Sequence, residues 1–156
     1  MPLRSRRMVL ESLESRQLLS VSTTSAHVSA LARPKPFTVV GTLTGSLTIS
    51  PPSESTVATG ELGRLGTVQL QGTDPKGTHK GVVFTFTSAQ GTLTFTSTYS
   101  SKVGPHEGYT LTLKKRTGAY ARWTGTGRLN IMAPPGPAPV VQPFPVVVPL
   151  RLTLKA

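Results

Sequence analysis

The sequence predicts an all-β fold: an antiparallel barrel of about eight strands, preceded by an N-terminal leader that is disordered or helical. Two observations carry this prediction. Apolar side chains alternate with hydroxyl-bearing ones along several stretches, which is the period of a strand with one buried face. Short segments containing glycine, proline and serine separate these stretches, as turns separate the strands of an antiparallel sheet.

Length and composition bound the domain organisation. We assign residues 1–36 to an export or sorting leader with its linker, and residues 37–156 to one barrel domain with a single core. The absence of cysteine excludes a disulfide framework and a thiolate metal site. The net charge is +11, and residues 37–156 carry eleven Lys and Arg against four acids. The barrel itself is therefore basic, which favours contact with polyanions but says nothing about fold.

The first half of the barrel begins with a long strand over residues 39–49. Apolar residues and glycine occupy one face of this strand, and mostly hydroxyls occupy the other. Gly41 and Gly45 lie on the apolar face and predict that the strand coils sharply. A turn at residues 51–55 leads into residues 58–70, where three glycines precede a strand-like exit. Because no helix follows these glycines, they do not form a dinucleotide-binding loop.

A Phe-rich hairpin and a third alternating strand supply most of the expected core. Residues 82–87 and 93–99 alternate in the manner of paired strands, and another strand starts at Tyr109 after a loop at residues 102–107. Rings at this spacing most often build core, and an interior binding surface is the alternative. The candidate interior residues are Phe84, Phe86, Phe95, Tyr109, Leu111 and Tyr120.

The last strand, over residues 146–155, alternates cleanly but contains Pro149. Half of the fourteen prolines lie between Pro134 and Pro149, so residues 133–145 are expected to form a stiff, extended crossing. Pro149 lacks a ladder donor, which predicts an edge or a bulge. The sequence leaves open whether the barrel closes at this strand.

The segment over residues 117–129 carries a family resemblance. It reads Thr-Gly-Ala-Tyr-Ala-Arg-Trp-Thr-Gly-Thr-Gly-Arg-Leu. This resembles the Thr-Gly-x-aromatic-Ala-x-x-Thr-Gly-x-Gly-x-Leu pattern of small bacterial barrels similar to the allene oxide cyclase and dirigent group, although Arg122 and Trp123 stand where small residues are usual. The resemblance implies a calycin-like barrel that can hold an apolar small molecule. Plant members of the group guide cyclisation or radical coupling by shape.

The leader carries a second resemblance. Residues 13–20 are similar to the LEPR-XLL motif near the start of bacterial exported and surface proteins, with Ser15 in place of proline. The resemblance implies export to the periplasm, the cell surface or the medium, and a surface-lying amphipathic helix or plain disorder is the alternative. Cleavage near Ala32 stays open, and no run reaches the ~20 apolar residues of a spanning helix. The motif residues are Leu13, Glu14, Arg16, Leu18, Leu19 and Ser20.

Residues suited to catalysis are scarce. His79 lies in a Gly/Thr/Lys loop, and His106 precedes Glu107 at a strand start. Neighbouring residues on a strand point to opposite faces, so His106 and Glu107 do not form a dyad, and both histidines are expected to be solvated. No Gly-x-Ser-x-Gly nucleophile turn occurs. We predict no catalytic residue, no metal site and no cofactor.

One basic cluster includes aromatic residues. Cations neutralise phosphates and aromatic faces stack bases, so such a cluster is one signature of polyanion binding. We favour the alternative, a charged turn that maintains solubility and protects an edge strand, and nucleic acid is not a favoured partner. The candidate rim residues are Lys114, Lys115, Arg116, Arg122, Trp123 and Arg128.

Three functions compete on these grounds. The first is a non-catalytic exported barrel that binds an apolar small molecule or serves as a cell-surface module. The second is a cyclase- or dirigent-like enzyme, which predicts a buried polar group facing the lumen. The third is a polyanion binder, which predicts salt-sensitive affinity that is lost when Lys114, Lys115 and Arg116 are neutralised. The sequence does not indicate the ligand or the oligomeric state.

Overall fold

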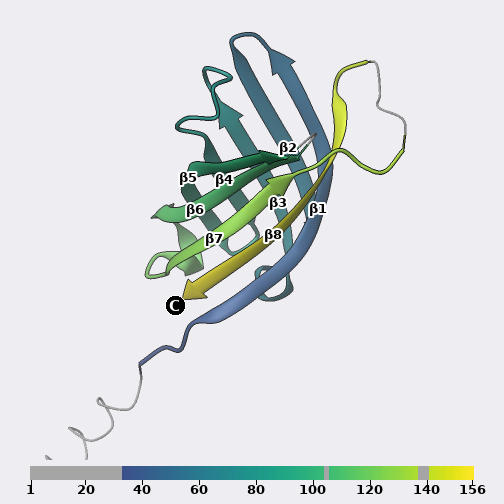
Figure 1. Ribbon diagram of the computed structural model, residues 1–156. Coiled ribbons are helices and arrows are strands. Elements are labelled where there is room, and N and C mark those ends of the chain that lie inside the picture. Colours follow the sequence, from purple (N-terminus) through teal and green to yellow (C-terminus); the bar gives the residue numbers. More distant parts are fainter. Residues whose placement is uncertain (1–32, 104–105, 137–140) are drawn as a thin grey trace, which may run out of the picture. The chain divides into compact units, whose positions relative to one another are not determined.

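The computed structural model describes residues 33–103, 106–136 and 141–156, and within them eight antiparallel strands form a closed barrel (Figure 1). Each strand pairs with the next in the chain, and the last pairs with the first. This confirms the predicted fold class. The strands are β1 (Phe37–Ser50), β2 (Ser53–Glu61), β3 (Thr67–Asp74), β4 (Val83–Ser88), β5 (Gly91–Val103), β6 (His106–Arg116), β7 (Thr124–Ile131) and β8 (Phe144–Lys155).

The leader motif at residues 13–20 and the cleavage position at Ala32 lie outside the described residues. The barrel belongs to the unit Lys35–Ala156. None of the helices in the described part of the chain has the length and apolar character needed to cross a membrane.

Strand β1 shows why the glycines occupy its inner face. Gly45 lies opposite Ala58 in the β1–β2 register, and a Cβ on Gly45 would overlap the backbone of Val57 and Ala58. A Cβ on Gly41 would meet the side chain of Leu62 in the same way. The glycines therefore let β1 bend closely over its neighbours, as the sequence predicted for a sharply coiled strand.

The barrel closes at β8 despite Pro149. Pro149 lies opposite Thr42 in the β1–β8 ladder, which is continuous from Phe37 to Leu47. On the other side, the β7–β8 ladder ends at Leu129 opposite Leu150 and reappears only as an isolated bridge farther along the chain. Pro149 thus falls in an interruption of one ladder, where its missing N–H removes no strand pairing, and the strand need not be an edge.

Two glycines of the segment 117–129 lie within β7, and contacts with β8 explain them. Gly125 and Gly127 lie on the inner face of β7, where added Cβ atoms would approach Leu154 Cδ2 and Leu152 Cδ2 at 2.6 and 2.5 Å. Those two leucines are fully buried. The glycines therefore leave the interior volume that the leucines of the neighbouring strand fill.

Two short 3₁₀ helices, η1 (Gly63–Leu65) and η2 (Gly118–Tyr120), lie at one end of the barrel. Leu65 and Tyr120 are buried, and the Tyr120 hydroxyl lies 2.6 Å from Ser88 Oγ. Trp123 packs against Tyr120 and Phe37, with ring centroids 4.6 and 5.3 Å apart. We call this end the aromatic mouth, and it is closed by side chains.

One boundary differs from expectation. The loop expected at residues 102–107 is mostly strand, because β5 continues to Val103 and β6 begins at His106. Lys102 pairs with Glu107 in this extended ladder. Glu107 is therefore held on a strand and not in a loop, which matters for the site below.

Candidate cation site at the acidic mouth

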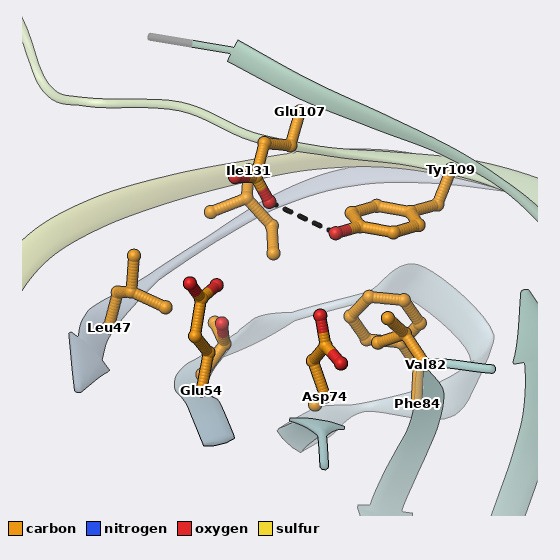
Figure 2. Close-up of a pocket in the computed structure, with 10 residues that line it drawn as sticks. Leu47, Glu54, Asp74, Val82, Phe84, Glu107, Tyr109 and Ile131 are labelled. Atoms are coloured by element: carbon orange, nitrogen blue, oxygen red, sulfur yellow. Dashed lines mark hydrogen bonds between the residues drawn. The ribbon is translucent and has the colours of Figure 1, made fainter. Parts of the chain in front are cut away.

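Three of the four acids in residues 37–156 gather at the end of the barrel opposite the aromatic mouth. Glu54 and Glu107 lie near the starts of β2 and β6, and Asp74 ends β3, so antiparallel order brings all three to the same end. Glu54 and Asp74 are directly opposite in the β2–β3 register. Figure 2 shows the three carboxylates and Tyr109 around one space. We name Glu54, Asp74, His79, Glu107 and Tyr109 the mouth site.

Asp74 shapes the loop that carries His79. Its side chain is only 5% exposed, and it accepts hydrogen bonds from the backbone N–H groups of Lys76 (3.1 Å) and His79 (2.7 Å). His79 has a φ of +58°, which non-glycine residues seldom adopt. The buried carboxylate stabilises this conformation through charge-assisted hydrogen bonds, so the loop presents the imidazole to the barrel.

The imidazole of His79 lies among acceptors. Its Nδ1 is 3.2 Å from the Tyr109 hydroxyl, 3.6 Å from Glu107 Oε2 and 3.8 Å from Asp74 Oδ2. The Tyr109 hydroxyl donates its own hydrogen to Glu107 Oε2 over 3.0 Å. In the bond to Tyr109, Nδ1–H of His79 is therefore the donor. The proton on Nδ1 faces oxygens of one phenol and two carboxylates.

Aromatic rings form one wall of the site. His79 stacks on Tyr99 with ring centroids 4.8 Å apart, and Tyr99 meets Tyr109 edge-on at 5.6 Å. Phe84 supports Tyr109 from the barrel interior at 5.1 Å. The Tyr99 hydroxyl is buried without a hydrogen-bond partner in the described structure. Burial and the nearby charge of Glu107 raise the pKa of Tyr99 above its ordinary value.

Tyr109 is held in its neutral form. Burial raises the pKa of Tyr109 most, and the charge of Glu107, the hydrogen bond to Glu107, and the charges of Asp74 and Glu54 raise it further. The phenol is therefore a hydrogen-bond donor at physiological pH and does not act as a base.

The space between these groups is small. The pocket lined by the three carboxylates, Thr56 and Tyr109 leaves about 10 Å³, which is room for about one water molecule or one ion. Near the aromatic mouth, the pocket around Phe86 and Tyr120 leaves about 0 Å³. All six candidate interior residues are buried, which agrees with a role in the core, and Phe86 packs on Phe95 at 5.4 Å.

Three side chains of the mouth site can converge on one ion. Carboxylate oxygens of Glu54 and Glu107 and a ring nitrogen of His79 all lie within 4.8 Å of one another, and all three residues are half-buried. Direct ligation requires distances of about 2.0–2.3 Å to the ion, so side-chain rotation would have to complete the contacts. The ligating nitrogen of His79 must carry no proton, so ligation through Nδ1 would displace the proton that this nitrogen donates to Tyr109. Asp74, already bound to backbone N–H groups, would remain a supporting acceptor.

The candidate rim residues do not form one cluster in the structure. Lys114, Lys115, Arg116 and Arg122 are exposed near the aromatic mouth, and Arg116 Nε donates to the Ala121 carbonyl. Arg128 lies farther along β7, opposite Arg151 of β8. Trp123 is half-buried with its ring packed on neighbours.

Both described histidines differ from the solvated residues expected from the sequence. The His79 side chain is 21% exposed and bonded, and Nδ1 of His106 is buried without a partner. The loop position of His79 alone did not reveal this, because its contacts come from β3, β5 and β6 together. The one available signal was that Glu107 and Tyr109, two residues apart, must share a strand face.

Comparisons with protein-family models, curated proteins and solved structures gave no match for this chain. The fold and the mouth site thus define the structural class of the protein: a closed eight-stranded antiparallel barrel with a compact acidic mouth. The resemblances of residues 117–129 and of the leader stay predictions.

Proposed function

We propose that this protein is a non-catalytic binding barrel whose mouth site binds a divalent metal ion through Glu54, His79 and Glu107. One observation carries the proposal: three donor atoms of suitable type lie within 4.8 Å of one another. They border a space of about ion size in a domain that is otherwise basic. Gathering three carboxylates is electrostatically costly, and a bound cation offsets that repulsion.

The small space argues for an ion over an organic ligand. A drug-sized molecule needs a pocket of about 300 Å³ or more, whereas the acidic mouth leaves about 10 Å³. An apolar molecule between Phe84, Phe86 and Phe95 would have to displace rings that are already buried against their neighbours. Interior binding of an apolar ligand is for this reason the weaker version of the binding-barrel proposal.

The donor set favours particular metals. Imidazole nitrogen suits Zn²⁺, Ni²⁺ and Fe²⁺, whereas Mg²⁺ and Ca²⁺ prefer oxygen alone. One histidine with two glutamates is a mixed set, so we expect Zn²⁺ and Ni²⁺ to bind more tightly than Mn²⁺, and Mn²⁺ more tightly than Mg²⁺. Asp74 would keep the loop of His79 in place through its two backbone hydrogen bonds.

Calorimetric titration of the chelator-treated full chain with Zn²⁺, Ni²⁺, Mn²⁺ and Mg²⁺ tests the proposal. We expect one ion per chain in that order of affinity, and a raised melting temperature as the ion saturates the folded state. Glu54→Gln, His79→Gln and Glu107→Gln should each weaken Zn²⁺ binding by about tenfold or more.

The matched control is Glu61→Gln. Glu61 is exposed at the far end of β2 from Glu54, so this variant removes the same charge outside the site. It should leave Zn²⁺ affinity unchanged. The absence of stabilisation by any of the four ions, or an equal loss in Glu61→Gln, would refute the metal site.

A second candidate has one observation in its favour. Asp74 and Thr56 are buried polar residues that face the space at the acidic mouth, as a cyclase- or dirigent-like enzyme requires. In that case neutral Tyr109 would donate a hydrogen bond to the substrate. Tyr109→Phe would abolish turnover of a cyclisation or radical-coupling substrate, while Zn²⁺ binding persisted. Metal-dependent turnover of that substrate that survives in this variant would contradict the role of the phenol.

We also propose, from the leader, that the barrel works outside the cytoplasm. The resemblance of residues 13–20 to an export motif supports this. Fractionation of cells that produce the full chain, compared with Leu18→Asp/Leu19→Asp, tests it. Equal cytoplasmic retention of both forms would contradict export.

A further inference from the structure

A second feature of the barrel is a depression on the outer faces of β6, β7 and β8. It shares no lining residue with the acidic mouth. It has a volume of about 460 Å³, and its lining includes two arginines and three threonines. The lining residues are Thr110, Thr126, Gly127, Arg128, Arg151 and Thr153. This volume is within the range of small-ligand sites.

Arg128 and Arg151 stand directly opposite each other in the β7–β8 register. Both side chains are exposed, and within the described residues neither makes a hydrogen bond or an ion pair. Like charges that face each other across two strands destabilise the pair. A bound anion would reverse this cost, because each guanidinium presents a fork of N–H donors that matches an oxyanion.

The surroundings of the arginine pair are also cationic. Lys114 is exposed on β6 and Lys155 on β8, opposite Thr124 of β7. The barrel acids lie elsewhere: Glu54, Asp74 and Glu107 line the acidic mouth, and Glu61 is on β2. The outer surface of β6–β8 therefore attracts anions over more than one position along the strands.

The chemistry of this surface discriminates among polyanions. Among the described residues every Phe, Tyr and Trp side chain is buried or half-buried, and the exposed large apolar residues are all valines. Single-stranded nucleic acid binds through stacking on exposed aromatic rings, so this surface is poorly suited to it. Threonine hydroxyls beside the two guanidiniums instead offer hydrogen-bond partners for the hydroxyl groups of a sugar.

We propose that the depression at Arg128 and Arg151 binds an acidic polysaccharide, with the two guanidiniums holding a sulfate or carboxylate group and the threonines contacting the sugar ring. The proposal is independent of the metal site, because the two sites share no residue.

Binding of the full chain to a heparin-derived oligosaccharide and to polygalacturonate tests the proposal. The first probe carries sulfate and carboxylate groups, and the second carries carboxylate alone, so the pair identifies the anionic group. We expect affinity that falls with increasing salt. Arg128→Gln and Arg151→Gln should each weaken binding by about tenfold or more. Arg128→Lys/Arg151→Lys should recover the salt dependence but only part of the affinity, because lysine lacks the planar fork.

The matched control is Lys76→Gln/Lys80→Gln, which removes two exposed positive charges from the β3–β4 connection, outside the depression. It should leave oligosaccharide binding nearly unchanged. Circular dichroism should confirm that all variants keep the fold. The proposal is overturned if neither probe binds, or if a short DNA duplex binds more tightly than both. It is also overturned if Lys114→Gln/Lys115→Gln/Arg116→Gln abolishes binding while the two arginine variants retain it.

Discussion

Tyr109 donates a hydrogen bond to Glu107, two residues earlier on the same strand, while accepting one from His79 of a distant loop. The phenol oxygen thus joins the β3–β4 connection to β6. Residues two apart share a strand face, and this simple period places the hydroxyl and the carboxylate at the same space. The arrangement leads to three predictions about stability.

Replacing Tyr109 with phenylalanine should keep the ring packing against Phe84 but remove both hydrogen bonds. We expect the free energy of unfolding at pH 7 to fall by about 1–2 kcal/mol, since Glu107 loses a donor in a partly buried position. Urea denaturation with an unchanged m-value measures this. An unchanged midpoint would show that water replaces the hydroxyl at no cost.

The raised pKa of Tyr109 predicts how stability changes in alkali. Below about pH 10 the phenol is protonated in both the folded and the unfolded chain, so the preference of the fold for neutral Tyr109 is fully present. Above that pH the unfolded chain loses the proton first, and stability decreases as the pH rises. This phenol contributes at most about 1.4 kcal/mol per pH unit.

Urea unfolding at several pH values between about 9 and 11 measures the alkaline slope. Tyr109→Phe should have a shallower slope than the unmodified protein, although Tyr99, whose pKa is also raised, keeps part of it. Identical slopes in the two proteins would mean that Tyr109 does not retain its proton in the folded state.

Asp74→Asn should destabilise the loop that presents His79. The replacement keeps the size of the side chain, but only one of its two terminal atoms can accept a hydrogen bond from the N–H groups of Lys76 and His79. We expect a loss of about 1–3 kcal/mol in the free energy of unfolding, and faster amide exchange at these two residues. Glu61→Gln, at an exposed position, should change stability by less than about 0.5 kcal/mol. Exchange rates unchanged by Asp74→Asn would contradict the role of this carboxylate.

The fold was predictable from the sequence because strand alternation is a local signal. Val39, Leu43, Phe84 and Leu152, for example, all lie on the buried face that their period indicated. Pro149 suggested an edge strand. Its missing backbone N–H is tolerated inside the barrel because the β7–β8 ladder is interrupted at that point. The position of this interruption follows from the strand register, which the local sequence does not show.

The candidate site was not predictable in the same way. Glu54, Asp74, His79 and Glu107 come from four separate segments, and only the register of β2 with β3 and the closure of the barrel bring them together. From the sequence, the adjacent pair His106 and Glu107 was considered and rejected as a dyad. The imidazole that contacts Glu107 is that of His79, 28 positions away by residue number. Long-range register has no signature in a single sequence.

Gly45→Ala tests whether close approach of the first two strands is needed for closure. The added methyl group would meet the backbone of Val57 and Ala58, which cannot rotate away as a side chain can. We expect a loss of about 1–3 kcal/mol or more in the free energy of unfolding. Thr44→Ala, at the exposed neighbouring position, is the control and should cost less than about 1 kcal/mol. If Gly45→Ala were no more destabilising than Thr44→Ala, β1 could separate from β2 at that point without loss, and the glycines of the long first strand would need another explanation.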